Sequence, residues 1–304
     1  MPPAMATVTR RFVTLDVFTE RRFAGNPLAV VLDSEGLDGA TMQAIAREFN
    51  LSETVFVLPA VHRSHRARLR IFTPAIEIPF AGHPTVGTAV LLRRIDAAGD
   101  GELILEEDVG DVRCVAEPIG PDGGRAKFEL PKLPQEIGPA AANDRLAAAL
   151  GIDAGDIGFD RFVPARWSAG AAYTFVPLRS LAAIRKCRVA PAQWDAIDRH
   201  GPSGAFAFCR DTVEQGHSFH ARMFAPGFGI AEDPATGSAV AAFAGLLARC
   251  ETLADGEHRF RIEQGYEMGR PSLIELSVSL EEEKLVAAAI GGEAVIVSQG
   301  TIEA

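Results

Sequence analysis

The stretch Arg70 to Leu92, RIFTPAIEIPFAGHPTVGTAVLL, decides the fold, because a related stretch recurs at Arg222 to Leu247, RMFAPGFGIAEDPATGSAVAAFAGLL. Each copy reads as a strand, a loop rich in proline and glycine, and a helix whose first turn holds small residues. The residues matched by aligning the copies include Arg70 with Arg222, Phe72 with Phe224, Pro84 with Pro234 and Gly87 with Gly237. The alignment places His83 opposite Asp233. Two polar residues of different chemistry therefore stand just before two predicted helices.

Both predicted helices lack a polar stripe. Their apolar residues run from Val86 to Leu92 in the first and from Ala239 to Leu247 in the second. A helix that is apolar all round must be buried on all sides. We therefore expect an α+β fold of two pseudo-symmetric domains, each a mostly antiparallel, barrel-like sheet around a central apolar helix. The two helix starts should face a common cleft.

The rest of the chain reads as many short strands with a few helices. The predicted elements include strands at Phe12 to Phe18, Pro27 to Leu32 and Glu53 to Leu58, a helix at Asp38 to Phe49, and two separate tail strands at Val286 to Ile290 and Ala294 to Ser298. The proline-punctuated stretch Pro131 to Pro139 is the best candidate for a linker. We expect one domain of residues 1–134, completed by a C-terminal strand at about 294–304, and a second of residues 135–293. The active site should lie in the cleft between them.

Composition and charge narrow the classes of partner. With 304 residues, of which 47% are hydrophobic, the chain can bury a sizeable core and divide into two domains. A net charge of -10 argues against nucleic acid, which is bound by clustered Lys and Arg. The longest apolar run, Ala239 to Ala248, is too short to span a bilayer, and the N-terminus lacks a signal-peptide core. We therefore expect a cytoplasmic protein with no membrane partner.

The cysteine spacing predicts reduced, structural thiols. The four cysteines are Cys114, Cys187, Cys209 and Cys250. They are widely scattered and show no CxxC spacing, which argues against a disulfide or zinc framework.

Both helix starts combine glycine with hydroxyl side chains. The first contains Thr85 and Gly87, and the second contains Thr236, Gly237 and Ser238. Free backbone N–H groups and the positive end of the helix dipole suit a carboxylate. We therefore expect these residues to bind an acidic group of a small molecule.

Asp233 has two interpretations. Followed by Pro234, it could cap a helix that has proline at its first position, and this alone would explain both residues. The repeat favours a functional carboxylate, because a purely structural cap would more naturally be Asp, Ser or Thr in both copies, whereas the first copy has His83. A lone histidine is more often structural, but its place opposite Asp233 raises the odds of function. Since His83 precedes Pro84, we expect His83 in an extended loop rather than a helix.

Glu53 begins an apolar strand in the stretch NLSETVFVL. A solvated carboxylate at a sheet edge is the simpler interpretation. Partial burial by apolar neighbours would instead raise the pKa of Glu53, so that it could take and return a proton near neutral pH. The corresponding part of the second half, SGAFAFC, has no acidic residue, so such a base would act alone.

The remaining signals do not indicate a cofactor. His217 and His220 have no obvious third ligand, so a structural or surface role is favoured over a metal site. Gly227 and Gly229 lack the third glycine and the downstream acid of a dinucleotide fingerprint. We expect no nucleotide, metal or other cofactor.

Five motifs span nearly the whole chain. They are RFAGNPLAVV (Arg22 to Val31), LSETVFV (Leu51 to Val57), FTPAIEIPFAGHPTVGTA (Phe72 to Ala89), MFAPGFGIAEDPATGSA (Met223 to Ala239) and GGEAVIVSQG (Gly291 to Gly300). In these motifs the chain closely resembles the PhzF family of phenazine-biosynthesis isomerases, within the diaminopimelate epimerase-like superfamily. The motifs are specific for the family and not for a substrate.

The resemblance implies two barrel-like domains with the site between them, and cofactor-free isomerisation of trans-2,3-dihydro-3-hydroxyanthranilate by moving a proton. It implies that Glu53 is the general acid/base, while His83 and Asp233 line the substrate pocket. Gly82 and Ser238 would join the helix amides in holding substrate. Related epimerases use a cysteine before each helix, and His83 and Asp233 stand in those places, which counts against two-thiol racemisation. A homodimer is a family-level expectation.

Together these observations predict an isomerase-like enzyme that acts on a small carboxylate without a cofactor. Glu53 would transfer the proton, and His83 and Asp233 would orient the substrate. One alternative is an amino-acid or cyclic-acid epimerase or racemase that uses Glu53 with Asp233 or His83 as second base. Another, from a different class, is a non-catalytic binding protein for small molecules on the same scaffold.

Overall fold

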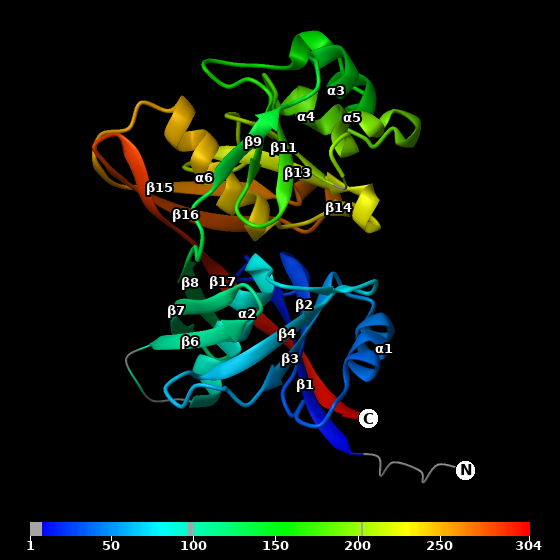
Figure 1. Cartoon of the computed structure of the whole chain (residues 1–304), viewed down its shortest axis with the longest axis vertical. Helices are drawn as coiled ribbons and strands as arrows, with labels where there is room; N and C mark the ends of the chain where they lie inside the picture. The colour runs from blue at the N-terminus through cyan, green and yellow to red at the C-terminus, as the bar shows by residue number, and fades with distance from the viewer. Residues whose placement is uncertain (1–7, 97–98, 100, 202) are drawn as a thin grey trace.

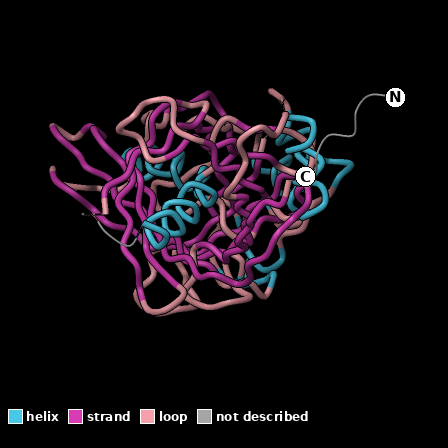
Figure 2. Tube along the Cα trace, turned by 90° about the horizontal axis from the view of Figure 1, so that it is seen from below, coloured by secondary structure: helices cyan, strands magenta, loops and turns pink. Residues whose placement is uncertain are grey.

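The computed structural model describes residues 8–96, 99, 101–201 and 203–304. The fold is mixed α+β, and its strands join into one 17-stranded sheet. The ribbon forms two lobes stacked along the long axis, with strand β17 (Lys284–Glu303) passing through the region where they meet (Figure 1). Seen end-on, strands surround helical segments in the interior (Figure 2).

The first part of the chain supplies most of the lower lobe in Figure 1. Its elements are β1 (Thr9–Val17), β2 (Asn26–Val31), α1 (Gly39–Phe49), β3 (Glu53–Leu58), β4 (Ala67–Phe72), β5 (Glu77–Ile78), α2 (Gly82–Asp96), β6 (Glu102–Glu107), β7 (Gly110–Ile119) and β8 (Gly123–Glu129). The predicted helix at Asp38 to Phe49 is confirmed. The Asp38 side chain accepts a hydrogen bond from the Thr41 N–H at 2.8 Å, and Asn50 ends the helix with a left-handed φ of 49°.

Eight strands of this lobe form a closed ring. They pair in the order β1, β2, β3, β4, β6, β7, β8 and β17, and β17 pairs back with β1. Only the β2–β3 and β4–β6 pairs in this ring are parallel. Helix α2 packs against β1, β2, β3, β6, β7, β8 and β17, and its residues from Gly82 to Leu92 are all buried. The prediction that this apolar helix is buried is therefore confirmed.

The second part of the chain supplies the upper lobe. Its elements are β9 (Gln135–Pro139), α3 (Asn143–Leu150), β10 (Ala165–Ser168), β11 (Ala172–Pro177), α4 (Leu181–Lys186), α5 (Asp195–Asp198), β12 (Gly204–Cys209), β13 (Phe219–Ala225), β14 (Ile230–Asp233), α6 (Gly237–Cys250), β15 (Gly256–Gln264), β16 (Ser272–Glu281) and β17, with short 3₁₀ turns at Ala154–Asp156, Pro191–Gln193, Pro226–Phe228 and Tyr266–Met268. The main strand series runs β9, β10, β11, β12, β13, β15, β16 and β17.

Helix α6 is enclosed by this second series of strands. It packs against β9, β10, β11, β16 and β17, and most of its residues are fully buried. Phe243, in the middle of the helix, lies against an aromatic cluster made of Phe175, Phe206, Phe208 and Phe219. Burying so much aromatic surface is a large favourable contribution to folding, which explains why this helix carries no polar side.

The internal repeat is visible in matching contacts outside the helices. Arg70 binds Glu77 through two guanidinium nitrogens, each at 2.7 Å, and lies over the Phe72 ring. In the second copy, Arg222 binds Glu232 in the same two-pronged way, at 2.7 and 2.8 Å, and lies over Phe224. The alignment of Arg70 with Arg222 and of Phe72 with Phe224 therefore corresponds to a repeated local structure.

Two predictions of element boundaries are wrong. Part of the predicted linker, Gln135–Pro139, is strand β9, whose backbone pairs with β10. The two predicted tail strands are one continuous strand, β17, although its sequence contains Gly291 and Gly292. Glycine is accepted here because other groups approach closely: a Cβ on Gly292 would lie 2.5 Å from a Phe18 ring carbon. The end of β17, from Ala294 onward, pairs with β1 in the lower lobe.

Candidate active site

Glu53 is the first residue of β3, where it pairs in parallel register with Leu28 of β2. Its side chain is 12% exposed, so very little water reaches the carboxyl group. This burial, with a smaller contribution from the negative charge of Asp233, holds the pKa of Glu53 well above its ordinary value. Burial therefore favours the protonated form of Glu53 more than in an ordinary, solvated glutamate, in line with the interpretation of a partly buried carboxyl group.

His83 lies directly against Glu53. The distance from His83 Nε2 to Glu53 Oε2 is 3.2 Å, and the His83 side chain is only 5% exposed. Burial lowers the pKa of His83 to about 3, so the ring is neutral at neutral pH. The contact between the two side chains does not have hydrogen-bond geometry, because Glu53 Oε2 and His83 Nε2 both lack a hydrogen-bond partner among the described residues.

The predicted extended loop at His83 is wrong, because His83 lies in the first turn of α2. Pro84 does not prevent this, since the first turn of a helix has N–H groups without intrahelical acceptors and loses nothing when one is missing. The turn aims His83 at Glu53, which lies on the neighbouring strand β3.

Asp233 is the last residue of β14 and is almost fully buried. Its Oδ1 accepts a hydrogen bond from Asn26 Nδ2 at 2.9 Å, and its Oδ2 accepts one from Thr236 Oγ1 at 2.5 Å. Burial raises the pKa of Asp233 to about 6, and these two donors partly offset that effect. Asp233 is therefore held as an acceptor on both oxygens. The alternative that Asp233 caps the helix is wrong, because α6 begins at Gly237 with Thr236 at the cap position.

Gln264 fixes the segment that carries Asp233. Its Nε2 donates to the Asp233 carbonyl at 2.7 Å and to Thr236 Oγ1 at 3.0 Å, while its Oε1 accepts from the Thr236 N–H at 3.1 Å. Because Thr236 Oγ1 accepts from Gln264, its own proton is free to go to Asp233. The Asn26 side chain also donates to the Ala235 carbonyl at 2.9 Å.

Sequence reasoning assigned no role to Asn26 or Gln264. Asn26 lies within the RFAGNPLAVV motif, and its place there was the only available signal. Gln264, on strand β15, lies in no quoted motif and gave no signal.

The starts of the two long helices touch. A Cβ placed on Gly82 would lie 2.9 Å from Gly237 Cα, and one placed on Gly237 would lie 3.2 Å from Gly82 Cα. Only glycine permits this approach of the two backbones. The N–H groups and positive dipole ends of α2 and α6 therefore converge next to Glu53, His83 and Asp233.

The other predicted binding residues divide into two groups. Ser238, in the first turn of α6, bonds to the Tyr173 hydroxyl at 2.7 Å, and burial raises the pKa of Tyr173. Thr85 and Gly87 face the protein interior: Thr85 bonds to Ala81 and Glu107, and a Cβ on Gly87 would lie 2.6 Å from Leu28 Cδ2. Substrate contact by Thr85 and Gly87 stays a prediction that this geometry does not favour.

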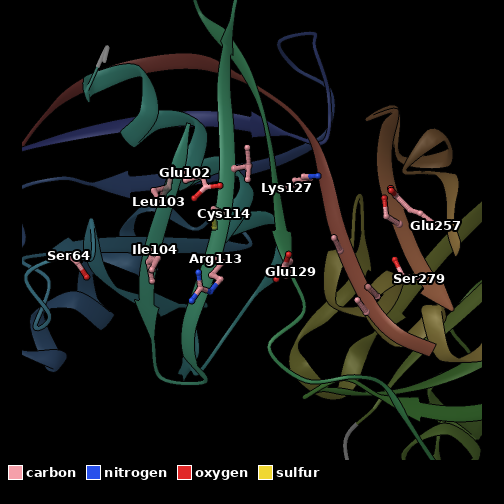
Figure 3. A pocket seen from close by; sticks show the side chains of 15 residues that line it. Ser64, Glu102, Leu103, Ile104, Arg113, Cys114, Lys127, Glu129, Glu257 and Ser279 are labelled. Atoms are coloured by element: carbon pink, nitrogen blue, oxygen red, sulfur yellow. The ribbon is translucent and has the colours of Figure 1, made fainter. Parts of the chain in front are cut away.

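A surface groove lies elsewhere. It has a volume of about 540 Å³ and is bounded by strands β6, β7 and β8 on one side and by β15, β16 and β17 on the other (Figure 3). Neither Glu53, His83 nor Asp233 lines it. The groove is open and polar, whereas the three candidate residues are enclosed, so the groove is not the candidate active site.

His217 and His220 bind carboxylates. Each donates its Nδ1–H to the Glu263 carboxylate at 2.7 Å, and His220 Nε2 lies 3.1 Å from Glu267. Burial alone would lower the pKa of His220, but the two carboxylates outweigh it and raise the pKa. These residues form a buried ion-pair cluster, as the structural interpretation predicted. In the described part of the chain, no group of three or more His, Cys, Asp or Glu is placed to hold a metal ion.

The four cysteines are free and buried. Burial raises the pKa of Cys187 and of Cys209 to about 12 and raises that of Cys114 as well. Such thiols are poor nucleophiles and bases at neutral pH. None of the helices among residues 8–96 and 101–304 combines the length and apolarity that crossing a membrane would require.

Comparisons with known proteins agree with this fold and site. The sequence profile of the PhzC-PhzF family, described as phenazine biosynthesis-like protein, matches residues 15–300. An uncharacterized isomerase of Mesorhizobium japonicum is 48% identical over 300 residues, which cover 97% of this chain and 99% of that protein. The trans-2,3-dihydro-3-hydroxyanthranilate isomerase of Pseudomonas chlororaphis is 34% identical over 298 residues, covering 96% and 98%.

Solved structures give the same answer for the fold. A PhzF-family phenazine biosynthesis protein of Bacillus anthracis superimposes with a TM-score of 0.87 at 26% identity, covering 97% of this chain and 99% of that one. A hydroxyproline epimerase of Agrobacterium vitis shares the fold more distantly, with a TM-score of 0.60 at 13% identity over 97% and 92%. The protein is thus an enzyme of the isomerase class on an epimerase-like scaffold. It belongs to the PhzC-PhzF family, as the resemblance predicted.

Proposed function

We propose that this chain is a cofactor-independent isomerase that moves a proton within a small carboxylate-bearing substrate such as trans-2,3-dihydro-3-hydroxyanthranilate. The observation that carries the proposal is the enclosed Glu53–His83 pair, which lies beside two convergent helix starts. A buried carboxyl group with a raised pKa can accept and return a proton near neutral pH, as general acid/base catalysis requires. The named relative from Pseudomonas chlororaphis supports the choice of substrate.

The two residues of the pair have different tasks in this proposal. Glu53, in its ionised form, removes a proton from one substrate carbon and returns the same proton to another. His83, a neutral ring whose Nε2 lies 3.2 Å from Glu53 Oε2, orients the substrate. No proton is gained or lost over the cycle, which matches an isomerisation.

Asp233 and the helix starts hold the substrate in this proposal. The amides at Gly82 and Gly237, with the Ser238 hydroxyl, would bind the substrate carboxylate through the positive ends of α2 and α6. Asp233, whose own oxygens are fixed by Asn26 and Thr236, would orient a donor group such as an amine or hydroxyl.

The test is ultraviolet-monitored turnover of trans-2,3-dihydro-3-hydroxyanthranilate by the wild type and by Glu53→Gln, which keeps the size of the side chain. Turnover by the wild type alone supports both the reaction and the role of Glu53. Equal turnover by the variant would disprove the role of Glu53. A folded wild type without activity would show that the substrate is another small acid.

The same protein also allows the two alternatives to be tested. Loss of an α-deuteron from an amino acid or cyclic acid, with inversion, would favour an epimerase in which Asp233 or His83 is the second base. Asp233 is compatible with that role, because burial raises its pKa to about 6. Ligand binding without any proton exchange into solvent would favour a non-catalytic binding protein.

We further propose the larger organisation that the repeat predicts. Residues 1–134 with about 294–304 would form one pseudo-symmetric domain and residues 135–293 the other, each with its long helix at the centre. The support for this division is that α2 packs against strands of the first part, α6 packs against strands of the second, and β17 packs against both helices. A cytoplasmic homodimer is also proposed, and sedimentation of the purified protein tests the dimer.

A further inference from the structure

Glu107 is a buried carboxyl group that the proposed mechanism does not use. It is the last residue of β6, and only 7% of it is exposed. Its Oε1 lies 2.8 Å from the hydroxyl oxygen of Thr85, one turn into α2. Its Oε2 has no hydrogen-bond partner among the described residues.

Thr85 makes a second close contact. Its hydroxyl oxygen also lies 2.8 Å from the carbonyl oxygen of Ala81, and its N–H donates to the same carbonyl at 3.2 Å. Ala81 directly precedes Gly82, the residue at which α2 begins and touches α6. The Thr85 hydroxyl therefore ties the start of α2 to Glu107.

The two contacts of the Thr85 hydroxyl indicate whether Glu107 is protonated. A threonine hydroxyl has one proton to donate, and a carbonyl oxygen can only accept. If Glu107 were ionised, Thr85 would face two acceptors at 2.8 Å with one proton, and one contact would be a repulsion between lone pairs. A protonated Glu107 removes the conflict, because it donates to Thr85 while Thr85 donates to Ala81.

We propose that Glu107 is a neutral carboxylic acid at neutral pH and a positioning residue for the active site. It is the first donor in the chain Glu107→Thr85→Ala81, which holds the start of α2 and with it His83. The unpartnered Oε2 fits this state, since a buried oxygen without a donor is far less costly on a neutral acid than on a carboxylate.

The surroundings of Glu107 also disfavour its charge. Burial is the main cause that raises the pKa of Glu107 to about 8, the Thr85 hydroxyl acts against it, and Asp108 adds to it. Glu107 in turn acts on Cys114 of β7, which is neutral because burial and Glu107 both raise its pKa. No cation is among the groups that set the pKa of Glu107.

The test measures stability against pH for the wild type and Glu107→Gln, by urea unfolding between pH 5 and pH 8. In this window the folded wild type holds one more proton than the unfolded chain, because the pKa of Glu107 rises from 4.5 to about 8 on folding. The unfolding equilibrium constant of the wild type relative to Glu107→Gln should therefore increase by up to about tenfold per pH unit. Glu53 and Asp233 titrate in both proteins, so their effects cancel. A ratio that does not change with pH would overturn the proposal.

Glu106→Gln is the matched control. Glu106 is the preceding residue on the same strand, and the backbone N–H groups of His62 and Val61 lower its pKa. Its linkage therefore has the opposite sign, and the ratio of wild type to Glu106→Gln should not increase with pH. The same increase in both comparisons would show that the effect is not specific to Glu107.

If unfolding is irreversible, infrared spectroscopy can detect the protonated carboxylic acid directly. In a Glu53→Gln background at pH 7, a band of a protonated carboxylic acid should remain and should disappear when Glu107→Gln is added. Absence of such a change would overturn the assignment. Hydrogen exchange of peptides covering residues 81–88 should be faster in Glu107→Leu, which has no donor, than in Glu107→Gln, and equal rates would overturn the positioning role.

Discussion

The starts of α2 and α6 come from two copies of one sequence pattern, yet they hold their polar residues in opposite ways. In the first copy His83 lies within the helix and its Nε2 faces Glu53 Oε2 across 3.2 Å, and neither atom has a hydrogen-bond partner in the described part of the chain. In the second copy Asp233 stays on strand β14, and both of its oxygens are occupied. The first site therefore leaves its carboxyl group without a hydrogen-bond donor, whereas the second holds its carboxyl group as an acceptor on both oxygens.

The difference begins with where each helix starts. The alignment of the copies places Gly87 opposite Gly237, but α2 begins five residues earlier, at Gly82, whereas α6 begins at Gly237. Because α2 begins earlier relative to the repeat, its first turn includes His83. The two copies thus share a framework that includes the Arg70–Glu77 and Arg222–Glu232 pairs. The aligned residues His83 and Asp233 nevertheless lie in different local structures.

The largest expected effect comes from Glu53→Gln. Removing the proposed acid/base should lower kcat by about 10²–10⁴-fold, the usual contribution of such a group. Stability at neutral pH should be unchanged or higher, because the amide is neutral like the protonated acid that it replaces. Activity assays and urea unfolding check both parts, and a large loss of stability would contradict the view of Glu53 as a neutral, weakly bound group.

Asp233→Asn should clearly lower the stability of the protein, in contrast to Glu53→Gln. An amide can accept on one side only, so its NH₂ must face either Asn26 Nδ2, which is itself a donor, or Thr236 Oγ1. In the second case the Thr236 hydroxyl accepts from both the amide and Gln264, and its own proton loses the acceptor that Asp233 provided. The buried mismatch should cost about 1–3 kcal/mol in free energy of unfolding. Asn26→Ala and the double variant complete a cycle, and additive losses would show that Asn26 and Asp233 do not act as a pair.

Gly82→Ala should destabilise the protein more than Gly237→Ala. The new methyl group would lie 2.9 Å from backbone atoms of Gly237 in the first variant and 3.2 Å from its nearest neighbours in the second. Forcing the helix starts apart should cost about 1–3 kcal/mol for Gly82→Ala. Thermal unfolding of both variants measures the order, and equal or reversed losses would show that the contact can relax.

The smallest effect expected is that of His83→Gln on acid stability, measured in a Glu53→Gln background to remove the coupling. Burial lowers the pKa of His83 to about 3 in the folded state, against an ordinary 6.5, so the unfolded chain binds the extra proton between these values. Stability therefore falls as pH decreases from 6.5 toward 3 when His83 is present. At pH 5 the variant should be more stable by up to about 2 kcal/mol, whereas at pH 7.5 this term should vanish.

The framework was readable in the sequence because its signals are local. Three such features depend on neighbours in the chain: the helix at Asp38 to Phe49, the apolar run after Val86 and the strand that begins at Glu53. The contacts that fix Asp233 are not local: Asn26 lies 207 residues before it and Gln264 lies 31 residues after it. One sequence gives no sign of which amide meets which carboxylate across a fold.

The start of α2 shows a different limit. The rule that proline disfavours a helical residue before it is a steric preference, and His83 is helical in spite of it. Deciding where the first turn falls required the contact between Gly82 and Gly237, which only the folded chain brings together. The resemblance named Gly82, to which local reasoning gave no role, and its contact with substrate stays a prediction.

The pairing of β1 with the end of β17 has a consequence for how the protein is made. The side chains of Thr9 and Glu303 hydrogen-bond although 294 residues separate them, and β17 is the strand that closes the ring around α2. The ribosome synthesises β1 to β8 long before β17, so the ring of strands around α2 cannot close until the second half has been synthesised. Contacts of such sequence separation slow folding, and the exposed edges of β1 and β8 are where a nascent chain would depend on chaperones.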